Sequence, residues 1–441
     1  MTTQKPVKTS YDVVVVGGGP AGTTFAHLMK NKGHDVLLVE RARHPRFSIG
    51  ESLLPATMPI WQELGLHQKF EEAGFIRKYG AYFDFHDGDA PEYFHFPDAV
   101  LSKSPYSYEV PRAEFDKVLW DAALDAGVHA LDKTAVRKFE VEGQRVTGVT
   151  VRTEDGEEKT IHARLVANCS GRASLLGRQL GIREKDEALD KVALFTHYRN
   201  ATRSSGDDEG TIAIIGAPFG WMWLIPFAGD QVSVGAVVHN ELFSQWKKDG
   251  WTREQMWDEI ISTTPTISCR VQRAERSRDI ETLANFSYRC KQLAGDGWVL
   301  IGDAGAFLDP VFSSGVHLAM SGAKLASRAA HRSLRKGRLP RTADFRGYQR
   351  RVRSALNVFS KFIYAWYDPN FRASFMRPPH HLKGVGHLKR HIIAVLAGDV
   401  FQAWRVLPPI GFLLLAARMR SRTATPELPA PGQSDAGASP A

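Results

Sequence analysis

The feature that most constrains the fold is a glycine-rich turn near the N-terminus, within YDVVVVGGGPAGTTFAHLMKNKGHDVLLVE. The β-branched run before the turn suits a buried parallel strand, and the residues after it predict a helix and then a second strand. Gly17, Gly19 and Gly22 form G-x-G-x-x-G between strand and helix. The first glycine permits the tight turn, the second lets a pyrophosphate approach the backbone, and the third allows close helix–strand packing. The stretch therefore predicts a dinucleotide-binding unit.

The end of the second strand carries an acid, Glu40, placed to accept hydrogen bonds from ribose hydroxyls. The amides at the N-terminus of the intervening helix suit the phosphates of a dinucleotide. NAD and FAD both use this arrangement, so the turn alone does not choose between them.

Two later segments, RLVANCSGRASLLGRQLG and GWVLIGDAGAFLDP, each read as a strand that runs into a glycine-rich turn. We expect the three turns to belong to one nucleotide-binding sheet assembled from distant parts of the chain. The alternating stretches YGAYFDFH, QRVTGVTVRT and QVSVGAVVH predict further strands, some of them in a second, antiparallel sheet.

Composition and charge limit the metal sites, cellular location and partners that we expect for this chain. Three cysteines, Cys169, Cys269 and Cys290, are too few and too scattered for a disulfide framework or a zinc cluster, so we expect no metal and a reducing cytoplasm. The N-terminus lacks the apolar core of a signal peptide, and the late run PPIGFLLLAARM is too short to span a bilayer. A net charge of +9 without a recognition motif argues against nucleic acid and favours anionic cofactors, halide or an acidic protein partner.

Asp303, directly after the hydrophobic strand and Gly302, is suited to a ribityl hydroxyl or a pyrophosphate-side group. Together with the first glycine turn, this segment resembles the flavoprotein monooxygenase superfamily with the fold of p-hydroxybenzoate hydroxylase. Arg112, in VPRAEFDKVLWDAA, matches the arginine that opens a helix beside the flavin there, and Val136 occupies a position that commonly contacts the adenine. This resemblance implies FAD.

Three further stretches resemble the flavin-dependent halogenases, and most closely their phenol- and pyrrole-halogenating branch. RFSIGESLLP resembles the flavin strap of that family, FGWMWLIP contains W-x-W-x-I-P, and FLDPVFSSG fits F-x-x-P-x-x-S-x-G. The likeness runs from Tyr11 to the late stretch FIYAWYDPNFRASF. The cofactor-binding residues it implies, with those of the glycine turn, are Gly17, Gly19, Pro20, Ala21, Gly22, Glu40, Arg41, Ile49, Gly50, Glu51, Arg112, Val136, Asp303 and Gly315.

The fold class implied is α/β: a Rossmann-type FAD-binding domain, an antiparallel substrate domain and a helical C-terminal region. We expect the FAD-binding domain at 1–75, 105–185 and 285–341, and the substrate domain at 76–104 and 186–284. Residues 342–420 are expected to be helical, and 421–441 form a Pro/Ala/Gly/Ser-rich tail predicted to be disordered.

The stretch W-x-W-x-I-P places Trp221, Trp223 and Ile225 on one face of a strand that ends at Pro226. Core packing is one explanation for such a pair of indoles. Beside the other motifs, a second explanation is stronger. In related hydroxylases the flavin passes oxygen directly to a stacked aromatic ring, and two indoles could block that approach while admitting a halide ion. The halide would become hypohalous acid and travel through the protein to the substrate.

The halogenase resemblance also assigns a halide site and a guide for the electrophile. The amides of Ser314 and Gly315 match positions that hold chloride in the family, and a Gly/Ser turn can form such an anion concavity. Lys78, in GFIRKYGAYF, matches the family's lysine. Its amine could hydrogen-bond hypohalous acid, or form a haloamine if neutral.

The substrate is expected to be an electron-rich aromatic compound, free or tethered to an acyl carrier protein. Phe312 stands where tryptophan halogenases carry a glutamate, which points toward phenols or pyrroles, whose heteroatoms stabilise the cationic intermediate. The pocket is predicted to include Tyr82, Phe83 and Phe312. Because the chain has no separate nicotinamide motif, a distinct flavin reductase would supply reduced FAD, with O2 and chloride or bromide as co-substrates.

Three other functions stay open at this point. An aromatic hydroxylase or epoxidase of the same fold would need its substrate to reach the flavin. A prenyl reductase would share the glycine turns but would have no use for Lys78 or the halide turn. A flavin-binding or carrier-docking protein without catalysis would bind FAD and never consume oxygen.

Overall fold

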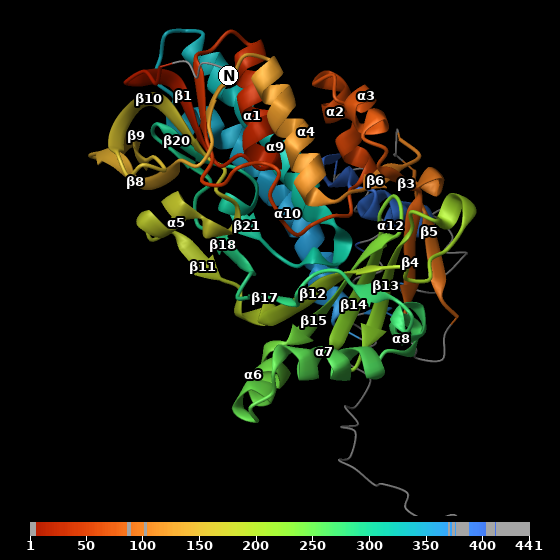
Figure 1. Ribbon diagram of the computed structural model, residues 1–441. Helices are drawn as coiled ribbons and strands as arrows, with labels where there is room; N and C mark the ends of the chain where they lie inside the picture. The colour runs from red at the N-terminus through yellow and green to blue at the C-terminus, as the bar shows by residue number, and fades with distance from the viewer. Residues whose placement is uncertain are drawn as a thin grey trace, which may run out of the picture.

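The computed structural model describes residues 6–85, 90–100, 104–368, 371–372, 375, 388–402 and 411. Two large sheets dominate this part of the chain, and helices cover their outer faces (Figure 1). The predicted tail at 421–441 and most of the region predicted to be helical beyond residue 368 lie outside the described residues. Among the helices that the structure does describe, none has the length and apolar character needed to cross a membrane.

The first sheet contains the three predicted glycine turns. Its strands run in the order β19-β20-β10-β1-β2-β7, and β9 and β8 extend it beside β10. Their bounds are Ser10–Val16 (β1), Val36–Val39 (β2), His129–Leu131 (β7), Ala135–Glu142 (β8), Arg145–Arg152 (β9), Glu158–Asn168 (β10), Ala294–Gly295 (β19) and Trp298–Leu300 (β20). Strand β10 pairs in parallel with both β1 and β20, so the three turns leave the same edge of one sheet. The sequence prediction that the three turns belong to one sheet, assembled from distant parts of the chain, is confirmed.

Packing on the first sheet explains the glycine pattern. Helix α1 (Pro20–Asn31) begins with a proline, whose missing N–H costs nothing in the first turn, and buries its first ten residues. A Cβ added at Gly22 would lie 1.8 Å from the carbonyl oxygen of Gly17, so only glycine allows this approach. Gly17 itself has φ +106°, a left-handed region that favours glycine.

The second sheet is largely antiparallel and has the order β16-β12-β15-β14-β13-β4-β5, with β17 also paired to β12. Its strands are Gly80–Asp84 (β4), Glu92–His95 (β5), Lys191–Arg199 (β12), Ile212–Ala217 (β13), Gly220–Pro226 (β14), Gln231–His239 (β15), Glu275–Arg276 (β16) and Glu281–Ala284 (β17). The alternation of β14 divides its side chains between two cores. Trp221, Trp223 and Ile225 face the core shared with the first sheet, whereas Met222 and Leu224 face the core on the other side.

Smaller elements complete the described structure. Strands Arg183–Lys185 (β11), Tyr288–Cys290 (β18) and Ala306–Phe307 (β21) form one small sheet, and Ile76–Lys78 (β3) pairs with Ser107–Glu109 (β6). The remaining helices are Met58–Glu63 (α2), His67–Glu72 (α3), Arg112–Asp125 (α4), Leu175–Gln179 (α5), Asn240–Lys248 (α6), Arg253–Ser262 (α7), Pro265–Val271 (α8), Ser314–Leu334 (α9), Arg346–Trp366 (α10) and Leu388–Leu396 (α12).

The strands of the second sheet all come from the segments predicted as the substrate domain. Strand β3 also falls in such a segment, but its partner β6 belongs to the predicted FAD-binding segment 105–185. The division of the chain into domains therefore stays a prediction.

The substitution Gly22→Ala should lower the free energy of unfolding of the apoprotein by about 1–3 kcal/mol, because the new methyl group overlaps the Gly17 carbonyl and must push the helix off the strand. The matched control is Gly347→Ala, at an exposed helical position where an added Cβ meets no atom within 4 Å. It should leave stability unchanged or raise it by up to ~1 kcal/mol. Chemical denaturation measures both, and equal stabilities would contradict the packing argument.

Candidate functional site

A cavity of about 770 Å³ opens along the carboxyl ends of the parallel strands and reaches the second sheet. Most of the residues predicted for the site line it: Gly17, Gly19, Pro20, Ala21, Glu40, Arg41, Ile49, Gly50, Glu51, Arg112, Val136, Trp221, Trp223, Ile225, Asp303, Ser314 and Gly315. Gly22, Pro226, Lys78, Tyr82, Phe83 and Phe312 are not among its lining residues. Segments far apart in the chain thus meet around one space large enough for a dinucleotide.

At the end of the cavity that contains the first glycine turn, the carboxylate of Glu40 holds the backbone by two hydrogen bonds. Its Oε2 accepts a hydrogen bond from the Gly18 amide at 2.6 Å, and its Oε1 accepts one from the Ala42 amide at 2.9 Å. The predicted ribose acceptor therefore also fixes the glycine turn. Each carboxylate oxygen has a further lone pair, so a ribose contact is compatible with these bonds.

The strap is held by Arg112. Its Nη1 donates to the carbonyl oxygens of Ile49 at 2.7 Å and Gly50 at 3.2 Å, while Nε donates to Asp116 Oδ1 at 2.8 Å. Asp116 is one helical turn further along α4, and it also pairs with Arg46 at the start of the strap. Asp116 was not predicted as a site residue, although it lies at i+4 from Arg112.

The cavity chemistry fits FAD. Asp303 lies at the turn after β20, and burial raises the pKa of its carboxyl group, an effect that the charges of Arg172 and Arg112 oppose. Both arginines act on Asp303 through charge alone, since its carboxylate accepts no hydrogen bond from a described residue. A carboxylate that lines the cavity without a donor from the described residues suits a polyhydroxylated chain such as the ribityl group of a flavin.

Trp221 and Trp223 form a wall on one side of this cavity. Their ring centroids are 5.8 Å apart, and the Trp223 indole N–H donates to Ser233 Oγ at 3.1 Å. The Trp223 ring lies against Gly235 of β15, where an added Cβ would come within 2.1 Å of it. The sequence prediction that the two indoles share a face of the strand is confirmed, and Gly235 provides the room for one of them.

The second indole is tied to the segment that precedes α9. Trp221 donates its N–H to Tyr367 Oη at 3.3 Å, and Tyr367 donates to Asp309 Oδ2 at 2.7 Å. Burial raises the pKa of Asp309 to about 6, although the bond from Tyr367 opposes this rise. Because Asp309 also accepts the Val311 amide at 3.0 Å, one carboxyl group connects the wall to the turn predicted to bind halide.

That turn places two amides at a helix N-terminus. Ser313 adopts a left-handed conformation, with φ 54° and ψ 25°, immediately before the 21-residue helix α9. The amides of Ser314 and Gly315 belong to the first turn of that helix, where backbone N–H groups have no helical acceptor and the helix dipole is positive. Both residues line the cavity beside the indole wall, a geometry suited to a small anion.

Lys78 lies beneath the strap and outside the cavity lining. Its side chain is 1% exposed, and its Nζ donates to Ser52 Oγ at 2.6 Å and to the Leu53 carbonyl at 3.3 Å. The carboxylate of Glu109 on β6 lies 3.9 Å from the amine. Burial lowers the pKa of Lys78, and the charge of Glu109 opposes that effect. Glu109 was not predicted as a site residue, because only the pairing of β3 with β6 brings it to the lysine.

The predicted aromatic pocket needs a correction. Tyr82 and Phe83 are neighbours on β4 and face opposite sides of the sheet: Phe83 packs in the core of the first sheet, and Tyr82 against the core of α7 and α8. They cannot line one pocket. Phe312 and Phe83 both contact Trp366 of α10, with ring centroids 5.5 and 5.4 Å away. A substrate contact stays a prediction for these two.

Comparison with known proteins places this geometry in context. Residues 10–335 match the FAD binding domain family. The chain is 35% identical over 366 residues to the tryptophan 2-halogenase of Chondromyces crocatus, an alignment covering 82% of this chain and 69% of that protein. It is 30% identical over 420 residues to the 1H-pyrrole-2-carbonyl-peptidyl-carrier-protein chlorinase of Pseudomonas fluorescens, covering 90% and 91% of the two chains.

The fold shows the same likeness. The structure of the myxobacterial chondrochloren halogenase CndH, described as a variant of FAD-dependent halogenases, superposes with a TM-score of 0.77 at 34% identity. The superposition covers 82% of this chain and 83% of that one.

The substitution Arg112→Lys should weaken FAD binding by about 10-fold or more, equivalent to about 1.4 kcal/mol, because lysine cannot bond Asp116 and the strap carbonyls at once. Titration of the apoprotein with FAD measures the change. The control, Arg77→Lys, replaces a half-exposed arginine paired with Glu71 and should leave affinity unchanged. Equal affinities for the Arg112→Lys variant and the wild type would show that the strap does not depend on this arginine.

Proposed function

The chain belongs to the flavin-dependent halogenases of the FAD-binding superfamily, and on that premise we propose that it halogenates a phenolic or pyrrolic compound with reduced FAD, O2 and chloride or bromide. One observation carries the proposal: the indole wall and the anion-suited turn of Ser314 and Gly315 border the same cavity. Such a cavity admits a halide ion beside the cofactor while the wall keeps an aromatic ring away from it.

When bound in its reduced form, FAD would supply two electrons to O2 and the halide ion two more, so that O2 ends as water and hypohalous acid and the flavin ends oxidised. Gly17, Gly19, Glu40, Arg112 and Asp303 would hold it. The amides of the α9 N-terminus would position the halide, and a water-poor cavity would strengthen that electrostatic attraction.

Lys78 would direct the electrophile to the substrate. The lysine lies behind Ser52, a residue that also lines the cavity, so hypohalous acid leaving the halide turn meets this part of the strap before it meets Lys78. Its amine would hold the hypohalous acid by a hydrogen bond or as a haloamine. Transfer of the halogen from the lysine to the substrate would then be regioselective, which attack by free hypohalous acid is not.

Phenols or pyrroles are the substrates we favour over tryptophan. Phe312 stands where tryptophan halogenases carry a glutamate, so that position has no carboxylate, and a phenol or pyrrole heteroatom stabilises its own cationic intermediate. The relatives include proteins named for both classes, a tryptophan 2-halogenase and a pyrrole-2-carbonyl chlorinase. The substrate assignment therefore rests on the residues of this chain.

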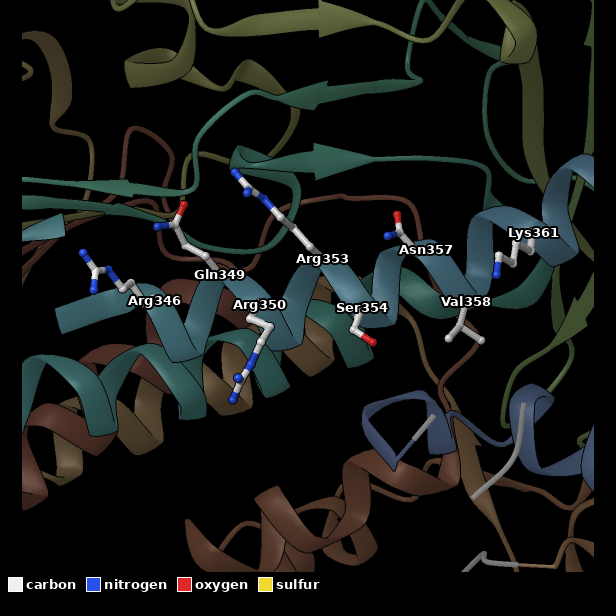
Figure 2. A pocket seen from close by; sticks show the side chains of 8 residues that line it. All are labelled: Arg346, Gln349, Arg350, Arg353, Ser354, Asn357, Val358 and Lys361. Atoms are coloured by element: carbon white, nitrogen blue, oxygen red, sulfur yellow. The ribbon is translucent and has the colours of Figure 1, made fainter. Parts of the chain in front are cut away.

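A carrier protein is the partner we propose to deliver the substrate. The outer face of α10 borders a groove of about 600 Å³, lined by Arg346, Gln349, Arg350, Arg353, Ser354, Asn357, Val358 and Lys361 (Figure 2). No acidic residue occurs in α10, so Arg346, Arg350 and Lys361 receive no counter-charge from their own helix. Such a positive face suits an acidic partner, and the chlorinase relative is named for a carrier-bound pyrrole.

A separate NAD(P)H-dependent flavin reductase would supply the reduced FAD, since the sequence has no second nucleotide motif. Reduced flavin can diffuse between two enzymes, so this proposal needs no docking surface between them.

The direct test supplies the purified protein with FAD, a flavin reductase, NADH, air and bromide, together with a panel of phenols and pyrroles as free acids and as carrier-bound acyl groups. Mass spectrometry should show a product with the paired isotopes of bromine, absent without the enzyme. A product that gains oxygen and no bromine would replace the proposal with an aromatic hydroxylase.

The substitution Lys78→Ala should leave FAD affinity unchanged and reduce brominated product at least ~100-fold, while hypobromous acid still accumulates, because the lysine lies outside the cofactor cavity. Product and trapped hypobromous acid are measured in the same reaction. Loss of FAD binding, or retained bromination, would contradict the role given to Lys78.

Reversing the charges of α10 in the double variant Arg346→Glu/Arg350→Glu should raise KM for a carrier-bound substrate about 10-fold or more and leave kcat/KM for a free phenol unchanged. The control, Arg199→Glu/Arg276→Glu, reverses two exposed charges on the edge of the second sheet. An equal loss with both kinds of substrate would mean that the α10 face has no docking role.

A further inference from the structure

The strap, β3 and β6 enclose a second group of polar residues, Lys78, Ser52 and Glu109, of which only Ser52 lines the cofactor cavity. Lys78 Nζ donates to Ser52 Oγ at 2.6 Å, and Ser52 Oγ donates to Glu109 Oε1 at 3.0 Å. Both ends of this series of hydrogen bonds are buried: Lys78 is 1% exposed and Glu109 0%. The donors already point in one direction, from the amine through the hydroxyl to the carboxyl group.

The strand pairing creates this contact. In the antiparallel pair β3–β6, Ile76 is opposite Glu109 and Lys78 is opposite Ser107, while Ser52 forms an isolated bridge with Glu109. Three separate segments therefore hold the lysine, the serine and the carboxyl group together. A carboxyl group placed there only for structure would need all its polar atoms bonded, yet Glu109 Oε2 has no partner in the described residues.

We propose that Glu109, acting through Ser52, is the positioning residue that keeps a proton on Lys78 and orients its amine toward the electrophile. The inference rests on the proposed halogenation and adds a residue to it. The position of Phe312 carries no carboxylate, and Glu109 provides one from a different strand.

Charge supports the geometry. Burial lowers the pKa of Lys78, and the charge of Glu109 is the one influence that raises it. In turn, burial raises the pKa of Glu109 while the charge of Lys78 and the hydrogen bond from Ser52 oppose that rise, so each member of the pair favours the charged form of the other. Without Glu109, the buried lysine would lose its proton at lower pH and could no longer donate a charged hydrogen bond.

The other charged groups around Lys78 have partners of their own. On the strap, Glu51 Oε1 lies 2.9 Å from His197 Nε2 of β12. On α4, Arg112 is paired with Asp116. From the segment after β5, the ring of Phe96 lies 5.3 Å from the amine and carries no charge. Glu109 is thus the ionisable group of the described residues that acts directly on the lysine.

The test compares wild type, Glu109→Gln and Ser52→Ala as FAD-loaded enzymes with a flavin reductase, bromide and the phenol or pyrrole that the wild type brominates best. Brominated product and hypobromous acid trapped by monochlorodimedone are measured across pH. In Glu109→Gln, the alkaline limb of bromination should move about 1–3 pH units lower, while total hypobromous acid is unchanged. In Ser52→Ala, the charges of Lys78 and Glu109 remain close together, so the alkaline limb of bromination should move less than in Glu109→Gln. More hypobromous acid should nevertheless be trapped, because the hydroxyl that links the two groups is lost.

A matched control is Glu140→Gln. Glu140 accepts from Thr150 Oγ1 at 2.6 Å and from Lys138 Nζ at 3.0 Å, the same lysine–hydroxyl–carboxylate combination on an open strand away from the cavity. Its pH profile should match the wild type.

The outcomes separate the inference from the proposed function. The inference is wrong if the wild type brominates but the alkaline limb of Glu109→Gln stays in place or moves to higher pH. A shift to higher pH would mean that the amine of Lys78 acts unprotonated. If Glu109→Gln does not fold, Ser52→Ala decides, and unchanged escape of hypobromous acid there overturns the inference. A wild type that forms neither product nor hypobromous acid overturns the proposed function and this inference together.

Discussion

The rest of the structure depends on the two-residue period of strand β14. That period sends Trp221, Trp223 and Ile225 into the cofactor cavity and Met222 and Leu224 into the core beneath α7 and α8. One strand therefore closes the cavity and joins two cores, so the wall cannot shift without disturbing both. Hydrogen bonds on both indole nitrogens limit the remaining freedom of the rings.

The strap connects this wall to the lysine. Arg112 holds the carbonyls of Ile49 and Gly50 on the cavity side, and two residues later Ser52 bonds Lys78 on the other side. A short segment thus borders both the space for oxidation of halide and the amine proposed to direct the electrophile. In the proposed function, separation of those two tasks would let the enzyme oxidise a halide while an organic ring is kept from the flavin.

The sequence predicted well those features that depend on local spacing. The glycine turn, the shared face of the two indoles and the three turns on one sheet edge follow from periods of two residues or from G-x-G-x-x-G. Glu109 and Gly235 could not be predicted in the same way, because their roles depend on the register of β3 with β6 and of β14 with β15. The error at Tyr82 was avoidable, since neighbours on a strand face opposite sides.

The measurement that most directly tests the account is anomalous X-ray diffraction from crystals of the FAD complex soaked in bromide, recorded at the bromine absorption edge. The account predicts a peak beside the amides of Ser314 and Gly315, on the same side of the indole wall as the flavin. A bromide ion found only beside Lys78 beneath the strap, or none in the cavity, would contradict the claim that halide binds beside the cofactor.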